Sequence, residues 1–256
     1  KLQILDIEDN TILVFMSDNG QTPVTGTPPD ELYNAGMRGL KGSPFDGGHR
    51  VPFLIRWPDG GISSGRSIDQ LASYIDFMPT LLDLCDVGVP EARSFHGESL
   101  RPLLEGNTDP HWTERAITVD TQRVAHPLKW RLSAVMKHTW RLLNRYELYN
   151  IAEDPGQVKD IAARHPDVVA DLQREYEKYW EICSRQDDEE IPTSIGSEAQ
   201  EITTLRTHDL RNEQDHMSVW DQSQVRRGNT AHGWWEIMVE ADGEYEFDLR
   251  RWPEEA

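Results

Sequence analysis

The feature that most constrains the fold is a short apolar run that ends abruptly in a carboxylate and an amide, at residues 11–20. Residues 12–16 have the length and composition of a β-strand and are too few for a buried helix. The sequence Asp18-Asn19-Gly20 then predicts a turn, because Asn and Gly tolerate positive φ. In open α/β sheets, ligand-binding groups gather just past the carboxyl ends of strands, where Asp18 and Asn19 would lie.

These two side chains offer oxygen donors to a cation. Carboxylate and amide oxygens suit Ca²⁺ or Mg²⁺, whereas zinc prefers nitrogen and sulfur donors. An ordinary strand that ends in an Asn-Gly turn would have the same sequence. The motif alone therefore leaves a metal site and a plain turn as alternatives.

A glycine-rich segment with a single lysine follows at residues 39–52. Lys41 has glycine two positions before it and one position after it, and Gly47-Gly48 comes later in the segment. Such a backbone bends readily and can approach a ligand closely, and lysine is a compact point charge for a tetrahedral oxyanion. The alternatives here are a solvated loop lysine for Lys41, a structural ion pair for Arg50, and loop scaffolding for Asp46 and His49.

Together the two segments resemble the formylglycine-dependent sulfatases of the alkaline phosphatase-like superfamily. Three more blocks resemble the same family in its order and at its spacing, at residues 75–84, 97–104 and 147–156. The resemblance covers nearly all of residues 10–180. It implies an α/β fold, the C-terminal portion of an alkaline phosphatase-like sulfatase, with a small antiparallel sheet crossed by one long helix.

The resemblance also implies roles for particular residues. Asp18 and Asn19 are similar to two ligands of the active-site divalent cation, usually Ca²⁺, with Mg²⁺ as the other candidate. Lys41 is similar to a substrate-binding and catalytic lysine that contacts the sulfate group. Asp46 stands where the family more often has Glu, and no role is implied for His49. The expected substrate is a sulfated small molecule or glycan.

The family nucleophile is a formylglycine made from Cys or Ser in a Cys-x-Pro-x-Arg motif. Cys85 and Cys183, the two cysteines, lie outside such a motif. Two ligands also cannot fill a calcium sphere of about 6 to 8 oxygens. We therefore expect part of an arylsulfatase-like sulfuric ester hydrolase, without its nucleophile-bearing N-terminal half and inactive alone. The full-length protein is expected in the periplasm or outside the cell.

The net charge of −19 argues against nucleic acid or an anionic membrane as a partner. No apolar run approaches the roughly 20 residues of a membrane-spanning helix. The same charge opposes a polyanionic substrate, so the surroundings of Lys41 must offset the overall field.

The chain divides into three parts. Residues 1–186 form the sulfatase part, in which we expect strands at 116–120, 132–137 and 140–144 and an amphipathic helix at 166–184. Asp76 is expected to cap a helix that follows it, and both cysteines lie on apolar helix faces, which predicts buried thiols. Residues 187–196 are an acidic linker. Residues 197–256 are expected to be a partial β-sandwich accessory module, with strands at 234–241 and 245–251 joined as a hairpin through Asp242-Gly243.

Three functions remain open from the sequence. The first is hydrolysis of an aryl or carbohydrate sulfate ester. The second is hydrolysis of a phosphonate or phosphate monoester, since relatives in the same superfamily share the metal chemistry. The third is a non-catalytic carbohydrate-binding protein built around the C-terminal module, which would bind glycans without a metal.

Overall fold

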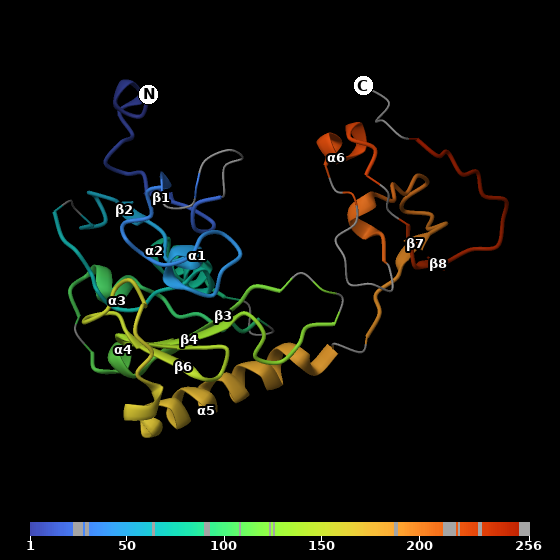
Figure 1. Ribbon diagram of the computed structural model, residues 1–256. Helices are drawn as coiled ribbons and strands as arrows, with labels where there is room; N and C mark the ends of the chain where they lie inside the picture. Colours follow the sequence, from blue (N-terminus) through green and yellow to red (C-terminus); the bar gives the residue numbers. More distant parts are fainter. Residues whose placement is uncertain are drawn as a thin grey trace. The chain divides into compact units, whose positions relative to one another are not determined.

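The computed structural model describes residues 1–22, 28, 31–62, 65–89, 93–107, 109–122, 124, 126–186, 189–211, 219, 221–229 and 232–250. The chain forms two compact units (Figure 1). Unit 1 consists of Lys1–Thr121 and Trp130–Glu181, and unit 2 consists of Gln122–Lys129 and Ile182–Ala256.

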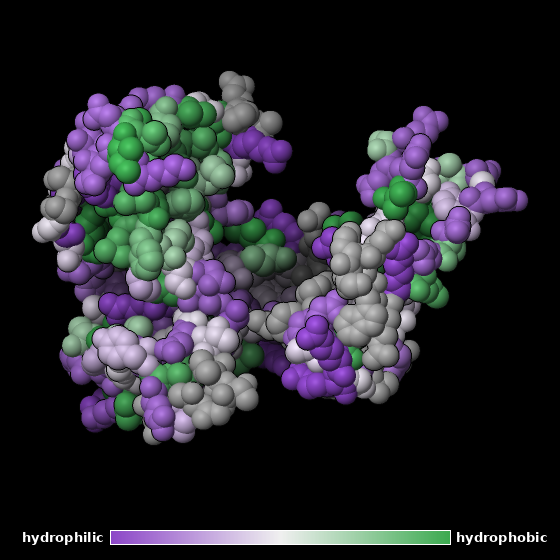
Figure 2. Space-filling view, turned by 90° about the horizontal axis from the view of Figure 1, so that it is seen from above, coloured by the Kyte–Doolittle hydropathy of each residue, from purple (hydrophilic) through white to green (hydrophobic). Residues whose placement is uncertain are grey.

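Unit 1 begins with a short 3-10 helix, η1 (Gln3–Leu5), and a two-stranded antiparallel sheet of β1 (Leu13–Met16) and β2 (Phe53–Arg56). Its register runs from Leu13 opposite Arg56 to Met16 opposite Phe53. Apolar side chains on this sheet are exposed, and Figure 2 shows hydrophobic residues gathered on this side of unit 1. The most exposed of them are Leu13, Phe15 and Leu54.

Short helices pack beside this sheet around the first hydrophobic core. They are η3 (Tyr74–Asp76), α2 (Phe77–Leu84), α3 (Arg101–Leu104) and α4 (His111–Glu114). Buried apolar side chains of these helices, together with Ile62 and Leu100, form one cluster against which Ile12, Ile55 and Trp57 pack: Leu84, Leu103, Leu104 and Trp112. This core fixes the strand that leads to the Asp18-Asn19 turn.

A four-stranded antiparallel sheet forms the second half of unit 1. Its strands follow one another in sequence order: β3 (Ala116–Asp120), β4 (Ser133–Lys137), β5 (Trp140–Leu143) and β6 (Glu147–Asn150). After η4 (Ala162–Arg164), the long helix α5 (Pro166–Cys183) crosses one face of the sheet (Figure 1). The predicted antiparallel sheet with one long helix is confirmed.

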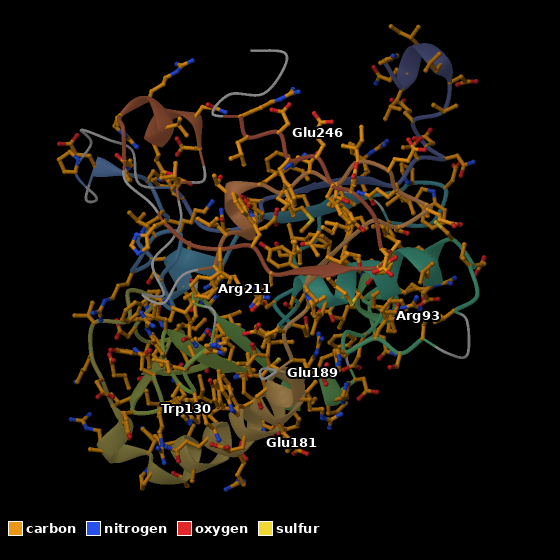
Figure 3. All side chains as sticks on the ribbon, turned by 90° about the vertical axis from the view of Figure 1, so that its right-hand side faces the viewer. Arg93, Trp130, Glu181, Glu189, Arg211 and Glu246 are labelled. Carbon is orange, nitrogen blue, oxygen red and sulfur yellow. The ribbon has the colours of Figure 1, made fainter. Side chains whose placement is uncertain are left out.

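The two faces of this sheet bury different partners. On one face, Leu172 and Tyr176 of α5 pack against Val135, Leu142 and Leu148. Trp130 lies between the sheet and the helix (Figure 3), where its ring stacks on Tyr176 with centroids 3.6 Å apart. The other face buries Ala134, Leu143 and Tyr149 against Phe45 of the glycine-rich segment. The sheet therefore supports the segment that contains Lys41.

Unit 2 contains few regular elements. Within its described residues these are η5 (Ser184–Gln186), β7 (Thr193–Ile195), η6 (Thr207–Asp209), α6 (Gln222–Arg226) and β8 (Ile237–Val239). The predicted hairpin is wrong, because β8 pairs in parallel with β7 and the described residues 245–250 form no strand. The ladder is completed by the Thr193 N–H, which donates to the Glu236 carbonyl at 2.9 Å. The partner of β8 is therefore β7, a strand distant from it in the sequence.

The prediction of buried thiols is also wrong, since Cys85 and Cys183 are both exposed. Cys85 lies just past the end of α2, so the helical stripe stops before reaching it. Cys183 is the last residue of α5, in a turn where Ile182 is exposed as well. None of the described helices combines the length and the apolar character needed to cross a bilayer.

Candidate functional site

The turn after β1 presents two oxygen-bearing side chains. Asp18 is exposed and Asn19 is half-buried. The Asn19 amide nitrogen donates to Asp18 Oδ1 at 2.9 Å and to the Gly20 carbonyl at 3.2 Å. The Ser17 hydroxyl donates to the Asn19 carbonyl at 3.0 Å, which tightens the same turn. The predicted turn is therefore present, with the carboxylate and the amide side by side.

Backbone hydrogen bonds hold this turn against the glycine-rich segment. The Gly20 N–H donates to the Gly48 carbonyl at 2.8 Å, and the Lys41 N–H donates to the Gln21 carbonyl at 3.0 Å. A Cβ atom on Gly20 would lie 1.9 Å from the Gly47 carbonyl oxygen, so only glycine permits this approach. The structure thus brings the two sequence motifs together at one place.

Lys41 lies at the bend of its segment. Gly39 and Gly42 have φ angles of 86° and 84°, a conformation that glycine adopts readily. The Lys41 side chain is exposed and borders a hollow of about 540 Å³. The lining of this hollow is partly apolar and partly polar: Leu32, Asn34, Met37, Gly39, Leu40, Lys41, Gly42 and Ser43.

Tyr74 joins this site, although no sequence pattern indicated it. Its hydroxyl lies 2.8 Å from the Ser17 carbonyl and 2.6 Å from the Asp18 carbonyl. Burial raises the pKa of Tyr74, and the negative charge of Asp18 raises it further. The tyrosine comes directly before the block at 75–84, but only the fold places it on the Asp18 turn.

Asp46 provides scaffolding within the Lys41 segment, the alternative that the sequence left open for it. It starts the single-turn helix α1 (Asp46–His49), and its side chain is buried. Arg141 Nε donates to Asp46 Oδ1 at 3.1 Å, and Arg50 lies 3.7 Å from Asp46 Oδ2. The Asp46 N–H donates to the Gln157 side-chain oxygen at 2.8 Å. Arg141 and Gln157 are far from Asp46 in the sequence, and no sequence motif predicted that they would contact it.

His49 also serves the scaffold. Its Nε2 donates to the Pro44 carbonyl at 3.1 Å. Burial lowers the pKa of His49, while the carboxylate of Asp46 opposes that shift.

Asp76 does not cap α2 as predicted. Its carboxylate turns back to accept hydrogen bonds from the Ser73 N–H at 2.8 Å and from the Glu98 N–H at 2.9 Å. It also forms a buried ion pair with Arg115, whose NH1 donates at 2.8 Å. The short helix η3 precedes α2 without a break, so the N–H groups that a cap would satisfy are already inside a helix.

The oxygen donors at the Asp18-Asn19 turn meet only part of what a divalent cation requires. Within the described ranges, no three or more His, Cys, Asp or Glu side chains are grouped so that they could hold a metal ion. The carboxylate of Asp18 and the amide of Asn19 are oxygen donors of the kind that a hard cation prefers. These two donors therefore suit such an ion chemically, but they are fewer than the roughly 6 to 8 oxygen ligands that Ca²⁺ takes.

A model of the family described as N-sulphoglucosamine sulphohydrolase, C-terminal, matches residues 41–182 of the 256-residue chain. The match covers more than half of the chain, including the Lys41 segment, the four-stranded sheet and nearly all of α5. The chain belongs to this sulfatase family. The resemblance drawn from the five sequence blocks is thereby confirmed.

Individual relatives agree with this assignment. An arylsulfatase from Hemicentrotus pulcherrimus is 36% identical over 117 residues, which are 43% of this chain and 20% of that protein. An N-acetylgalactosamine-6-O-sulfatase from Bacteroides thetaiotaomicron is 29% identical over 202 residues, which are 67% of this chain and 36% of that protein.

A solved structure shares the fold. The crystal structure of Ps i-CgsB in complex with k-i-k-neocarrahexaose aligns with a TM-score of 0.58 and 28% identity, over 70% of this chain and 38% of that one. The architecture is therefore the alkaline phosphatase-like one of sulfatases. The chain spans only 20% and 36% of the length of the two sulfatases described above.

Proposed function

We propose that this chain supplies part of the active site of a sulfuric ester hydrolase. Asp18 and Asn19 ligate a divalent cation, Ca²⁺ or in its place Mg²⁺, and Lys41 binds the sulfate group of the substrate. The observation that carries the proposal is the pair of backbone hydrogen bonds, Gly20 to Gly48 and Lys41 to Gln21, that joins the two motifs.

The geometry supports a division of labour between these residues. Lys41 carries its ammonium group at the end of a flexible side chain, on the backbone bend between Gly39 and Gly42. The ammonium group can therefore reach a tetrahedral anion and offset negative charge on it. Such a fixed cation stabilises a transition state in which charge develops on the departing oxygen. A cation held by Asp18 and Asn19 would polarise the sulfate oxygens as a Lewis acid.

We propose that residues other than Asp18, Asn19 and Lys41 supply the remaining metal ligands and the nucleophile. Cys85 and Cys183 are exposed and lie outside the Cys-x-Pro-x-Arg motif, so neither is assigned as a formylglycine precursor. The apolar side chains exposed on β1 and β2 fit a surface that another polypeptide segment covers. That segment would lie next to the strand that carries Asp18 and Asn19.

The substrate class we propose is a sulfated glycan or small molecule. The name of the Bacteroides thetaiotaomicron relative specifies a sulfated amino sugar, and that of a human relative, 34% identical over 110 residues, specifies a steryl sulfate. Both are monoesters of sulfuric acid, and the sulfate group is the part that Lys41 would contact. Periplasmic or extracellular location of the whole enzyme belongs to the same proposal.

Calcium titration of the chain tests the metal half of the proposal. Calorimetry is expected to show weak saturable binding to the unmodified chain. Asp18→Asn should weaken it by about tenfold or more, because the substitution removes the only formal charge of the pair. Glu153→Gln removes one exposed carboxylate from the turn after β6, outside the Asp18 turn, and is expected to leave the affinity unchanged. Equal affinities in all three proteins would refute the assignment of Asp18.

Inorganic sulfate tests the other half. Lys41→Met keeps the length of the side chain and removes its charge, so sulfate affinity should fall by about tenfold. Lys159→Met, on an exposed turn, is the matched control and should bind as before. Phosphate that binds more tightly than sulfate would favour a phosphate monoester hydrolase of the same superfamily. Glycan binding that survives Lys41→Met and calcium removal would favour a carbohydrate-binding protein.

A further inference from the structure

The Lys41 segment rests on the face of the four-stranded sheet that lies opposite α5 (Figure 1). Phe45 is the apolar contact, packed against Ala134, Leu143 and Tyr149. The guanidinium group of Arg38 lies 3.9 Å above the centre of the Phe45 ring. Apolar packing of this kind holds a segment in place but specifies its orientation loosely, because it has no direction.

A buried ion pair adds direction to this contact. The side chains of Arg141 on β5 and Asp46 on the segment are 5% and 1% exposed, and Arg141 Nε donates to Asp46 Oδ1 at 3.1 Å. Arg141 is itself fixed, because its NH1 donates to the carbonyls of His138 and Trp140, both at 2.9 Å. The planar guanidinium group is thus held with its Nε–H directed at the carboxylate.

Gln157 is a second crosslink, from the turns after β6. Its side-chain oxygen accepts the Asp46 N–H at 2.8 Å, and its backbone carbonyl accepts a hydrogen bond from Arg38 NH1 at 3.0 Å. Gln157 is fully buried and has a φ of 48°, so its own backbone is tightly constrained. One residue therefore fixes both ends of the stretch from Arg38 to Asp46, in which Lys41 lies.

The crosslinks continue into the Asp18 turn. Gly47, next to Asp46, donates its N–H to the Arg38 carbonyl at 2.8 Å. Its neighbour Gly48 accepts the Gly20 N–H at 2.8 Å. Hydrogen bonds at both ends of the backbone stretch Asp46-Gly47-Gly48 therefore connect the sheet to the turn that presents Asp18.

Stability alone does not account for this arrangement. Within the described structure, two buried polar atoms lack a hydrogen-bond partner: Asp46 Oδ2, whose ion-pair partner Arg50 is 3.7 Å away, and Gln157 Nε2. Buried ion pairs are often no more stabilising than apolar side chains of the same volume, and each unpaired polar atom is unfavourable. The contribution of this pair therefore lies more in the geometry that it imposes on the segment than in net stability.

We infer that Arg141 and Gln157 are positioning residues, which act through Asp46 to set Lys41 against the Asp18-Asn19 turn. Neither touches the substrate. The expected effect on sulfate affinity rests on the proposed function. The structural coupling itself can be measured whether or not sulfate binds.

The test compares the unmodified chain with two conservative variants. Arg141→Lys keeps the charge and loses the planar group, and Gln157→Asn keeps a side chain that tolerates positive φ but shortens its reach. Hydrogen exchange of the Gly20 and Lys41 amides, followed by NMR, should accelerate about tenfold in both variants, because one hydrogen bond that holds Asp46 is lost. The affinity for inorganic sulfate should fall by a similar factor.

The control is Val135→Ala, in the core on the α5 face of the same sheet. It should lower the overall stability without changing the exchange of the two amides relative to global unfolding. Adding Asp46→Glu to Arg141→Lys lengthens one partner as the other shortens, and should restore slow exchange and sulfate affinity together.

The inference would be overturned if Arg141→Lys had the same amide exchange rates and the same sulfate affinity as Val135→Ala at equal stability. The ion pair would then be structural only. An unmodified chain that binds no sulfate would refute the proposed function, while the exchange measurements would still decide the coupling. The two failures are therefore distinguishable.

Discussion

At the scale of single residues, Gly20 connects the two motifs of the site. It is buried, it donates to the Gly48 carbonyl, and a Cβ on it would collide with backbone of Gly47. A side chain as small as methyl therefore cannot be added without separating the Asp18 turn from the Lys41 segment. The glycine has a steric role here, since its backbone conformation is one that other residues also adopt.

Gly20→Ala is accordingly expected to lower the free energy of unfolding by about 1–3 kcal/mol, the usual effect of overpacking. Chemical denaturation followed by tryptophan fluorescence measures this loss. Calcium and sulfate affinity should fall together, because the substitution moves both motifs apart. Gly88→Ala is the control, since a Cβ on Gly88 meets nothing within 4 Å. If both alanine variants were equally stable, the close approach of the two backbones would be disproved.

At the scale of elements, much of the fold was predictable from local sequence. The strand at 116–120 and the helix from Pro166 were predicted within about a residue of their observed bounds, because hydrophobic periodicity is a local signal. The Asp18-Asn19 turn was predicted from Asn19 and Gly20, whose turn-forming tendency is also a local signal. Each of these features depends on neighbours in the chain.

The features that escaped prediction depend on distant partners. Arg141 meets Asp46 across 95 residues, and Gln157 meets it across 111, so no spacing reveals either contact. Likewise, β8 pairs with β7 rather than with the segment after Asp242-Gly243. Hairpin propensity was overridden there by a parallel pairing that only the folded chain makes available. Tyr74 and Asp76 illustrate the same limit, since tertiary contacts determine where their side chains turn.

At the scale of the whole molecule, charge sets the conditions under which the site can work. The chain has 45 acidic and 26 basic residues, so its overall field repels a sulfated substrate. At about 0.1 M salt that field is screened beyond about 10 Å, whereas contacts within the site are screened much less. The positive charges of Lys41 and of a cation at the Asp18 turn would attract a bound sulfate locally and so outweigh the overall repulsion.

The stability of unit 1 should depend on pH through His49. Three charged groups face the imidazole, Asp46, Arg50 and Arg141, and burial lowers its pKa below the ordinary value of 6.5. The unfolded chain therefore takes up a proton at a higher pH than the folded chain. The contribution of His49 to stability is complete above pH 6.5 and is lost as the pH falls through the lowered pKa.

His49→Gln keeps a donor for the Pro44 carbonyl and removes the titrating group. Denaturant unfolding at a series of pH values should show a shallower loss of stability below pH 6.5 in this variant than in the unmodified chain. His126→Gln, which replaces an exposed histidine, should leave the profile unchanged. A profile that is the same for all three proteins would contradict the assignment. The pH dependence would then have to arise from other titratable groups.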